Sequence, residues 1–159
     1  MRFAKISAAV LSVALLVSCD HGTKHLAKTH LEGQRALEMV PGIFELRYTE
    51  NTDTAFSLLH RFVAPGPRHW LLSVMMVVAV LAIAAFVATR WRVLTSVQRA
   101  GGLIVLGGAL GNVIDRLARG YVVDFLHVSY WPIFNVADVA ICIGGLLLAF
   151  GASEQRASA

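Results

Sequence analysis

The chain has 159 residues, of which 57% are hydrophobic and 15% are charged, and its mean hydropathy is +0.65. A chain of this length with so many apolar residues is not an ordinary soluble domain, so the composition predicts an integral membrane protein. The formal net charge is +4. The basic residues are scattered or flank apolar stretches instead of forming one stripe, which argues against a nucleic-acid partner.

Four stretches are long and apolar enough to be membrane-spanning helices, which need about 17 to 25 mostly apolar residues. In chain order they are residues 3–19, 69–89, 97–117 and 134–152. The second is the clearest, because Trp70 and Trp91 would lie about 31 Å apart at a helical rise of about 1.5 Å per residue, one at each membrane interface. The predicted fold class is an all-α membrane protein with four transmembrane helices, in a single domain over residues 1–159.

The first stretch has two interpretations. Arg2 and Lys5, followed by an apolar run that ends at Cys19, have the layout of a bacterial lipoprotein signal. In that case Cys19 would become the lipidated N-terminus of the mature chain. The alternative is that the first helix is not cleaved and stays in the membrane. We favour it, because a protein that needs three other membrane helices gains little from a first helix that is removed.

Basic residues in short segments predict the orientation of the helices. Arg2 and Lys5 lie at the N-terminal tip, and residues 90–99 hold arginines without an acidic residue. Both chain termini and the 90–99 connection are therefore expected on the cytoplasmic side. Residues 20–67 and the connection 119–131 are then expected on the outer side.

The outer segment 20–67 is predicted to form a small β-sheet at the membrane surface. Residues 36–49 have the pattern of a short hairpin, with Pro41-Gly42 as its turn. Residues 51–57 are expected to turn back toward the bilayer, and Pro65-Gly66-Pro67 to end the segment before the second helix.

The third predicted helix contains the densest group of polar residues. Asn112, Asp115 and Arg116 are spaced at i, i+3 and i+4, so they share one helical face in apolar surroundings. Asn135 and Asp138, at i and i+3 near the start of the fourth helix, form a second such face. Small residues on the third helix would allow close approach of its neighbours: Gly107, Gly108 and Gly111.

Asp124 and Asp138 are the strongest candidates for chemistry. Both have apolar neighbours, and the predicted topology brings both to the outer side. A carboxylate within the bilayer costs about 2.5–3.5 kcal/mol, so it is a functional-site hypothesis by default. Structural roles stay open as well: Asp115 can pair with Arg116 or Arg119, and Asp138 can interact favourably with a helix dipole.

Two carboxyl groups in one site predict an aspartyl protease. They do not both ionise easily, so one keeps a proton while the other acts as a base toward water. The sequence lacks the His-Glu-x-x-His and Gly-x-Ser-x-Gly motifs of other hydrolases, and His21 and His25 have no third metal ligand nearby. We therefore expect neither a metal nor a cofactor. His127 is either a solvated loop residue or a group that tunes Asp124.

The sequence resembles the lipoprotein signal peptidase family, also called signal peptidase II. The resemblance is carried by residues 107–116 (GGALGNVIDR), 122–125 (VVDF) and 134–138 (FNVAD), in that order. Residues 20–24 (DHGTK) and 51–56 (NTDTAF) are similar to the two N-terminal motifs of the family. The resemblance covers essentially the whole chain.

The resemblance implies removal of signal peptides from bacterial prolipoproteins in the cytoplasmic membrane, by a cut just before a diacylglyceryl-modified cysteine. It implies that Asp124 and Asp138 are the catalytic dyad. It also implies supporting or substrate-positioning roles for Asp20, Lys24, Asn51, Asn112, Arg116 and Asn135. The outer sheet would cradle the substrate while its lipid chains stay in the membrane lipid. Globomycin-type cyclic peptides are the expected inhibitors, and we expect a monomer.

The chain departs from the family pattern at a few positions. Asp53-Thr54 replaces a common Gly-Ala, His21 replaces a Gln, and the connection from Asp124 to Asp138 is short. A catalytically inactive paralogue therefore remains an alternative. A membrane binding or transport subunit is a second alternative, although four short spans without an inverted repeat are few for a transporter.

Overall fold

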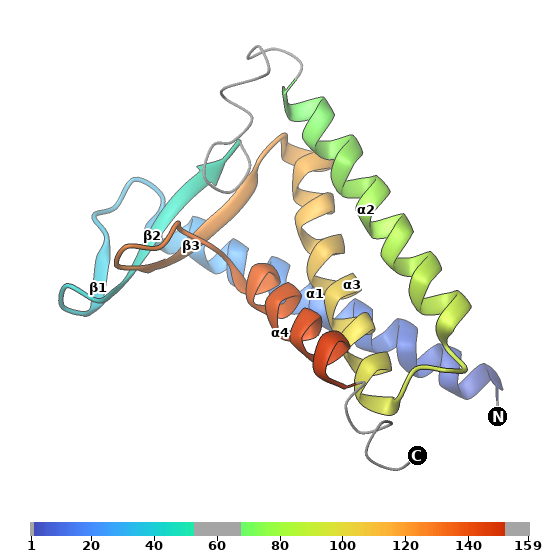
Figure 1. Ribbon diagram of the computed structural model, residues 1–159. Coiled ribbons are helices and arrows are strands. Elements are labelled where there is room, and N and C mark those ends of the chain that lie inside the picture. The colour runs from blue at the N-terminus through green and yellow to red at the C-terminus, as the bar shows by residue number, and fades with distance from the viewer. Residues whose placement is uncertain (1, 53–67, 152–159) are drawn as a thin grey trace.

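The structure is a computed structural model that describes residues 2–52 and 68–151. Its elements in chain order are α1 (Arg2–Leu31), β1 (Leu37–Val40), β2 (Phe44–Asn51), α2 (Arg68–Arg90), α3 (Ser96–Arg119), β3 (Val122–Val128) and α4 (Val136–Phe150). Figure 1 shows the sheet beside one end of the helices, whereas the start of α1, the turn between α2 and α3 and the end of α4 lie toward the other end. Asp53-Thr54, and with them most of the turn expected at 51–57, lie outside the described residues.

Helix α3 is the centre of the helical part, because it packs against α1, α2 and α4. It begins with a capping box, in which the Thr95 side chain accepts from the Gln98 backbone and the Gln98 side chain accepts from the Thr95 backbone. It ends at Gly120, whose φ of 81° is the left-handed conformation that favours glycine. This end directs the chain from α3 into β3.

Glycines on α3 bring its neighbours close to it, as the sequence predicts. A Cβ on Gly108 would lie 2.5 Å from the backbone oxygen of Ala137 in α4, and one on Gly111 would lie 2.5 Å from Oδ2 of Asp20 in α1. No side chain fits at such distances. The two glycines therefore allow α1 and α4 to deliver polar groups to the same part of α3.

Three helices, α1, α2 and α3, are long and apolar enough to cross a membrane. Many large apolar side chains of α2 are exposed, among them Val74, Val78 and Leu81, as expected for a surface that faces lipid. Helix α4 is apolar but has only 15 residues. It is shorter than the predicted span 134–152, because Asn135 has an extended backbone and caps the helix.

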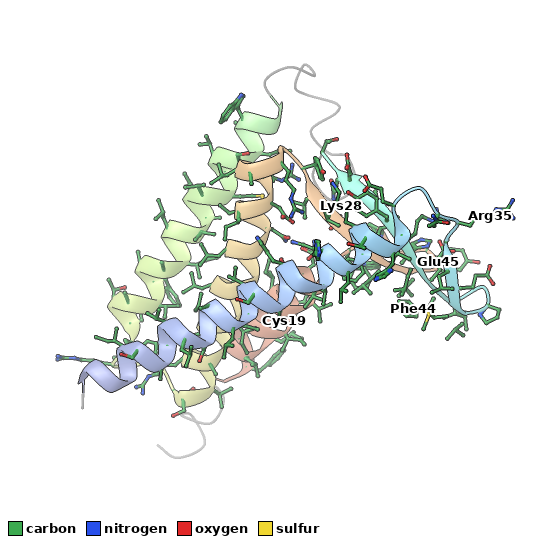
Figure 2. The ribbon with its side chains drawn as sticks, turned by 180° about the vertical axis from the view of Figure 1, so that it is seen from behind. Cys19, Lys28, Arg35, Phe44 and Glu45 are labelled. Carbon is green, nitrogen blue, oxygen red and sulfur yellow. The ribbon has the colours of Figure 1, made fainter. Side chains whose placement is uncertain are left out.

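Helix α1 is longer than the predicted span 3–19 and continues without interruption to Leu31. The expected boundary at residue 19 was based on the polar residues that follow it. These residues stay helical because Asp20 and Lys24 are buried against α3 and α4 and are paired there. Figure 2 shows Cys19 within α1 and Lys28 farther along the helix toward the sheet.

The sheet has three antiparallel strands in the order β1-β2-β3. The hairpin of β1 and β2 agrees with the sequence prediction, and the connection 119–131, for which no strand was predicted, contains β3. Asn51, expected in a turn, is the last residue of β2 and lies opposite Val122. The pairing of β3 with β2 turns this segment into a strand and aligns Asp124 with Thr49.

The two faces of β3 differ in character. Because side chains alternate along a strand, Asp124, Leu126 and Val128 share one face, and His127 lies on the other. Leu126 is paired with Leu46 of β2, and His127 with Glu45. An apolar face therefore extends outward from Asp124, while the opposite face is polar around Glu45 and His127.

Candidate active site

Asp124 lies on β3 with its side chain buried, and each of its carboxyl oxygens accepts a hydrogen bond from an asparagine. Oδ1 accepts from Nδ2 of Asn135 at 2.6 Å, and Oδ2 accepts from Nδ2 of Asn51 at 2.8 Å. Burial raises the pKa of Asp124 to about 6, against the opposing effect of the hydrogen bond from Asn51. A carboxyl group of this kind exchanges its proton near neutral pH.

Asp138 lies in the first turn of α4 and forms a capping box with Asn135. Its Oδ2 accepts from the backbone N–H of Asn135 at 3.1 Å, while Oδ1 of Asn135 accepts from the backbone N–H of Asp138 at 3.0 Å. Its Oδ1 accepts from Nδ2 of Asn112 at 2.9 Å. The structural role at the helix start, left open by the sequence, is therefore present together with a second contact to α3.

Asn135 connects the two aspartates. It is fully buried, its side-chain amide donates to Asp124, and its backbone and side chain both bond Asp138. The negative charge of Asp138 also raises the pKa of Asp124, so the two carboxyl groups interact electrostatically. The residues that the sequence singled out on β3 and α4 thus form one site.

Lys24 of α1 lies behind this pair and is completely buried. Its ammonium group contacts Oδ2 of Asp20 at 2.7 Å and Oδ2 of Asp115 at 2.9 Å, and it donates to Oδ1 of Asn112 at 2.9 Å. A buried lysine needs partners of this kind, since an unpaired charge is costly in apolar surroundings. The N-terminal motif of the sequence is therefore joined to the two aspartates through Asn112.

Asp115 also belongs to the site, although the sequence suggested it only as a structural partner of an arginine. It pairs with Arg119, at 3.2 Å from Nη1 to Oδ1, in addition to Lys24. Arg116 is buried on the same helix. Helical spacing indicated the shared face of α3, but it gave no sign that the face is turned toward Lys24.

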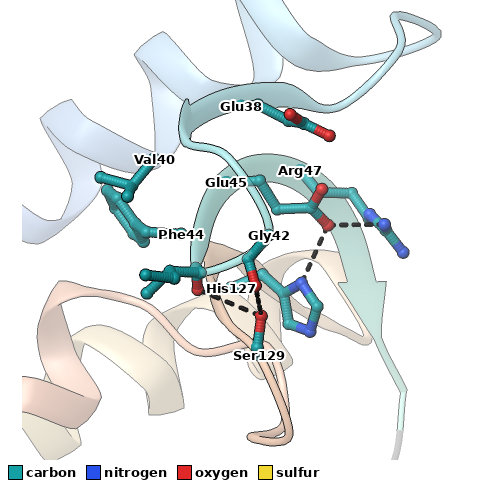
Figure 3. Close-up of a pocket in the computed structure, with 9 residues that line it drawn as sticks. Glu38, Val40, Gly42, Phe44, Glu45, Arg47, His127 and Ser129 are labelled. Carbon is teal, nitrogen blue, oxygen red and sulfur yellow. Dashed lines mark hydrogen bonds and ion pairs between the residues drawn. The ribbon is translucent and has the colours of Figure 1, made fainter.

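His127 lies on the face of β3 opposite to Asp124, so it belongs to a strand instead of a loop, and the described part of the structure gives no contact through which it would tune this aspartate. Its Nδ1 lies 2.8 Å from Oε1 of Glu45, whose carboxylate also pairs with Arg47. Figure 3 shows these side chains in a pocket of the sheet, where the hydroxyl of Ser129 donates to the backbone oxygen of Gly42. Within residues 2–52 and 68–151, no group of His, Cys, Asp and Glu residues is arranged to hold a metal ion.

The fold and the site define a helical membrane protein in which a buried and a partly buried aspartate share an asparagine, and a pair of carboxyl groups is what an aspartic peptidase needs. The sequence model described as "Signal peptidase (SPase) II" matches residues 12–153. The chain belongs to this family, in which the peptidase is of the aspartic type. The match extends across Cys19, which favours a retained first helix over a cleaved lipoprotein signal.

Relatives and solved structures agree with this assignment. A lipoprotein signal peptidase of Pseudoalteromonas translucida is 39% identical over 146 residues, which is 89% of this chain and 85% of the relative. One of Syntrophotalea carbinolica is 39% identical over 153 residues, covering 93% and 92% of the two chains. A solved bacterial membrane enzyme has the same fold, with a TM-score of 0.77 at 22% identity over 96% of this chain and 92% of the other.

Proposed function

We propose that this protein removes signal peptides from bacterial prolipoproteins, with Asp124 and Asp138 as its catalytic pair. The relatives named above are lipoprotein signal peptidases. The observation that carries the assignment of the pair is Asn135, which bonds both carboxyl groups. A membrane binding or transport subunit would have no need for two carboxyl groups connected in this way, so this alternative is not favoured.

The proposed reaction is hydrolysis of the peptide bond just before the diacylglyceryl-modified cysteine. The ionised carboxylate of the pair takes a proton from the attacking water, whose oxygen bonds to the carbonyl carbon. The protonated carboxyl polarises the carbonyl oxygen in the same step. When the tetrahedral intermediate collapses, the C–N bond breaks and the amine of the cysteine leaves with a proton from the carboxyl group.

The other predicted residues support the pair in this proposal. Asn51 and Asn135 fix both oxygens of Asp124, and Asn112 fixes Asp138. Asp20 and Lys24 connect α1 to α3 and α4 behind the pair. Arg116, buried on the same face of α3, would help to position the pair or the substrate backbone.

A cleavage assay tests the proposed function. The purified protein in lipid or detergent is incubated with a diacylglyceryl-modified prolipoprotein, and the wild type is compared with Asp124→Asn and Asp138→Asn. Each variant keeps the shape of the side chain and removes its carboxyl chemistry, so we expect a folded protein that does not cleave the substrate.

Glu50→Gln is the matched control, because it neutralises an exposed carboxylate of β2 outside the network and should cleave normally. Full activity in either aspartate variant would rule out the pair, and an inactive wild type would favour the inactive paralogue.

The substrate and inhibitor contacts of the proposal concern the outer face of the site. The apolar sheet face that continues from Asp124 to Leu126 would cradle the substrate, whose diacylglyceryl chains remain in the membrane lipid. Globomycin-type cyclic peptides would compete for the same place. One chain can supply every side chain that bonds Asp124 and Asp138, so the proposed site needs no second copy and we propose a monomer as the active form.

We further propose four membrane spans in a single domain over residues 1–159 of the bacterial cytoplasmic membrane, with both termini in the cytoplasm. The sheet and the site would then lie near the outer face. In support, the start of α1, the turn between α2 and α3 and the end of α4 lie toward one end in Figure 1, and the sheet lies at the other. In this arrangement α4 crosses with 15 helical residues and the segments that flank it.

Labelling from outside tests this topology. In a background with Cys19 and Cys142 replaced by serine, Tyr130→Cys and Val93→Cys each offer one thiol at a well exposed position. An impermeant maleimide added to intact spheroplasts should label the cysteine at 130 and leave the one at 93 unlabelled until the membrane is opened. The reverse pattern would invert the topology.

A further inference from the structure

The ammonium group of Lys24 has as many partners as it has N–H bonds. It contacts Oδ2 of Asp20, Oδ2 of Asp115 and Oδ1 of Asn112, all between 2.7 and 2.9 Å. An ammonium group has three donors and no acceptor. Each N–H therefore has its own oxygen, which fixes the position of the completely buried nitrogen.

This donor determines which way the amide of Asn112 points. Because Lys24 can only donate, the atom of Asn112 that faces it is the carbonyl oxygen Oδ1. The amide nitrogen is then turned to the other side, where it donates to Oδ1 of Asp138 at 2.9 Å. Lys24 thus orients the donor that Asp138 receives from α3, although its own three N–H bonds go to Asp20, Asp115 and Asn112.

The same orientation continues into Asn135. Oδ1 of Asn112 also accepts from Nδ2 of Asn135 at 3.2 Å, and this nitrogen donates to Oδ1 of Asp124 at 2.6 Å. Oδ1 of Asn135 is left to accept from the backbone N–H of Asp138. Lys24 therefore favours the orientation of the Asn112 and Asn135 amides in which each aspartate receives a side-chain N–H donor.

We propose that Lys24 is a positioning residue of the reaction, which sets the direction of the hydrogen bonds through Asn112 and Asn135 to the two aspartates. The inference rests on the proposed function, in which these aspartates act as the catalytic pair. Without Lys24, the amide of Asn112 is free to turn and to present its oxygen to Asp138. That contact requires a proton on the carboxyl group, so the ionised form of the pair would lose both a donor and a nearby positive charge.

Several charged groups surround this nitrogen, and their balance determines the effect on pH dependence. They are Asp20 and His21 on α1, Asp115, Arg116 and Arg119 on α3, Asp124 on β3 and Asp138 on α4. Asp20 and Asp115 are paired with Lys24, and Asp115 also with Arg119. Removal of the Lys24 charge leaves an excess of negative charge near the pair, which disfavours a further ionised carboxylate. The acid limb of the activity profile should therefore move to higher pH.

A double-mutant cycle tests the inference. Cleavage of a diacylglyceryl-modified prolipoprotein is measured for the wild type, Lys24→Met, Asn112→Ala and the double variant, with Asp124→Asn as the inactive reference. Misplacement of a catalytic group costs about 100-fold, so we expect each single variant to lose about this much in kcat at a nearly unchanged KM. At a pH on the plateau of each profile, where the charge of Lys24 no longer limits ionisation of the pair, the double variant should be no slower than Asn112→Ala, because Lys24 positions the pair through Asn112. Lys24→Met should also shift the acid limb of kcat/KM upward.

Lys28→Met is the matched control on the same helix. Lys28 lies one turn farther along α1 and contacts the hydroxyl of Tyr121 at 3.5 Å, so its loss should leave kcat and the pH profile unchanged. If Lys24→Met does not fold, the comparison is made in an Asp115→Asn background, which carries one buried carboxylate fewer. There Lys24→Met should again lower kcat and shift the profile.

The outcomes separate this inference from the proposed function. An inactive wild type would overturn the proposed function, and the inference with it. Suppose instead that the wild type is active and Asp124→Asn is inactive, but that the kcat losses of Lys24→Met and Asn112→Ala multiply in the double variant. That result would overturn only the positioning role. The same holds if Lys24→Met lowers stability but leaves kcat and the pH profile of the folded protein unchanged.

Discussion

Oδ1 of Asp20 accepts the backbone N–H of Ala137 at 3.0 Å, so a carboxylate of α1 bonds the first turn of α4. The start of a helix has unpaired N–H groups and a partial positive charge. A carboxylate there accepts from the N–H groups and interacts favourably with the charge. Asp138 follows Ala137 directly. The contact therefore holds in place the helical turn that carries one of the two aspartates.

Asp20→Ala should destabilise the protein by about 3–5 kcal/mol, the usual effect of removing one partner of a buried ion pair. The variant loses the bond to Ala137 and one of the two carboxylates on Lys24. Asp20→Asn should cost less, because its oxygen still accepts from Ala137. Thermal unfolding in detergent measures both. His21→Ala is the control, since His21 lies 3.5 Å from Asp20 and is partly exposed, and a loss as large as that of Asp20→Ala would contradict the assignment.

Gly111→Ala and Gly145→Ala should have opposite effects. A Cβ at Gly111 would lie 2.5 Å from Oδ2 of Asp20, whereas one at Gly145 of α4 meets no atom within 4 Å. Overpacking costs about 1–3 kcal/mol, so Gly111→Ala should be destabilising and should also lower activity. Gly145→Ala should be neutral or should stabilise by roughly 0.5–1 kcal/mol, as alanine does in a helix. Equal melting temperatures for the two variants would disprove the close approach of α1 to α3.

Much of the fold could be predicted because its helices are continuous apolar runs and its hairpin has a turn at Pro41-Gly42. The third strand could not be predicted. Val122 and Val123 favour a strand, but whether such a short segment becomes one depends on an edge to pair with, here β2. The predicted span 3–19 is shorter than α1 for a related reason. Asp20 and Lys24 mark the end of an apolar run in the sequence, and only their partners on α3 and α4 explain why the helix continues.

The candidate site was predicted in its members but not in its connections. Asp124 was found from its apolar neighbours, Asn112, Asn135 and Asp138 from polar residues at helical spacing, and Asn51 from the family resemblance. Asn112 lies 88 positions from Lys24 in sequence, so no local pattern indicates that they are bonded. Asp115 shows the limit of periodicity: the face of α3 could be predicted, but not the helix that packs against it.

The stability of the wild type should depend on the protonation of Asp124. The pKa of this group is about 6 in the folded protein and near 3.8 when exposed, so the folded state binds the proton more tightly. Its contribution to stability is therefore fully present below pH 3.8 and is lost as the pH rises through about 6, which amounts to about 3 kcal/mol. Asp124→Asn removes this dependence, so its melting temperature should exceed that of the wild type at pH 7.5 and approach it near pH 4. Parallel curves across this range would contradict the raised pKa.

His127→Gln should leave the chemistry of the site unchanged, because β3 directs His127 and Asp124 to opposite faces of the sheet. Nδ1 of His127 contacts Glu45, and Glu45 pairs with Arg47, so the substitution acts on the pocket of the polar face in Figure 3. The pH profile of kcat/KM should match that of the wild type. Asn51→Ala, which removes a donor to Asp124 from the neighbouring strand, should instead move the acid limb to higher pH. A shift with His127→Gln as large as that with Asn51→Ala would mean that the histidine communicates with Asp124 through the sheet.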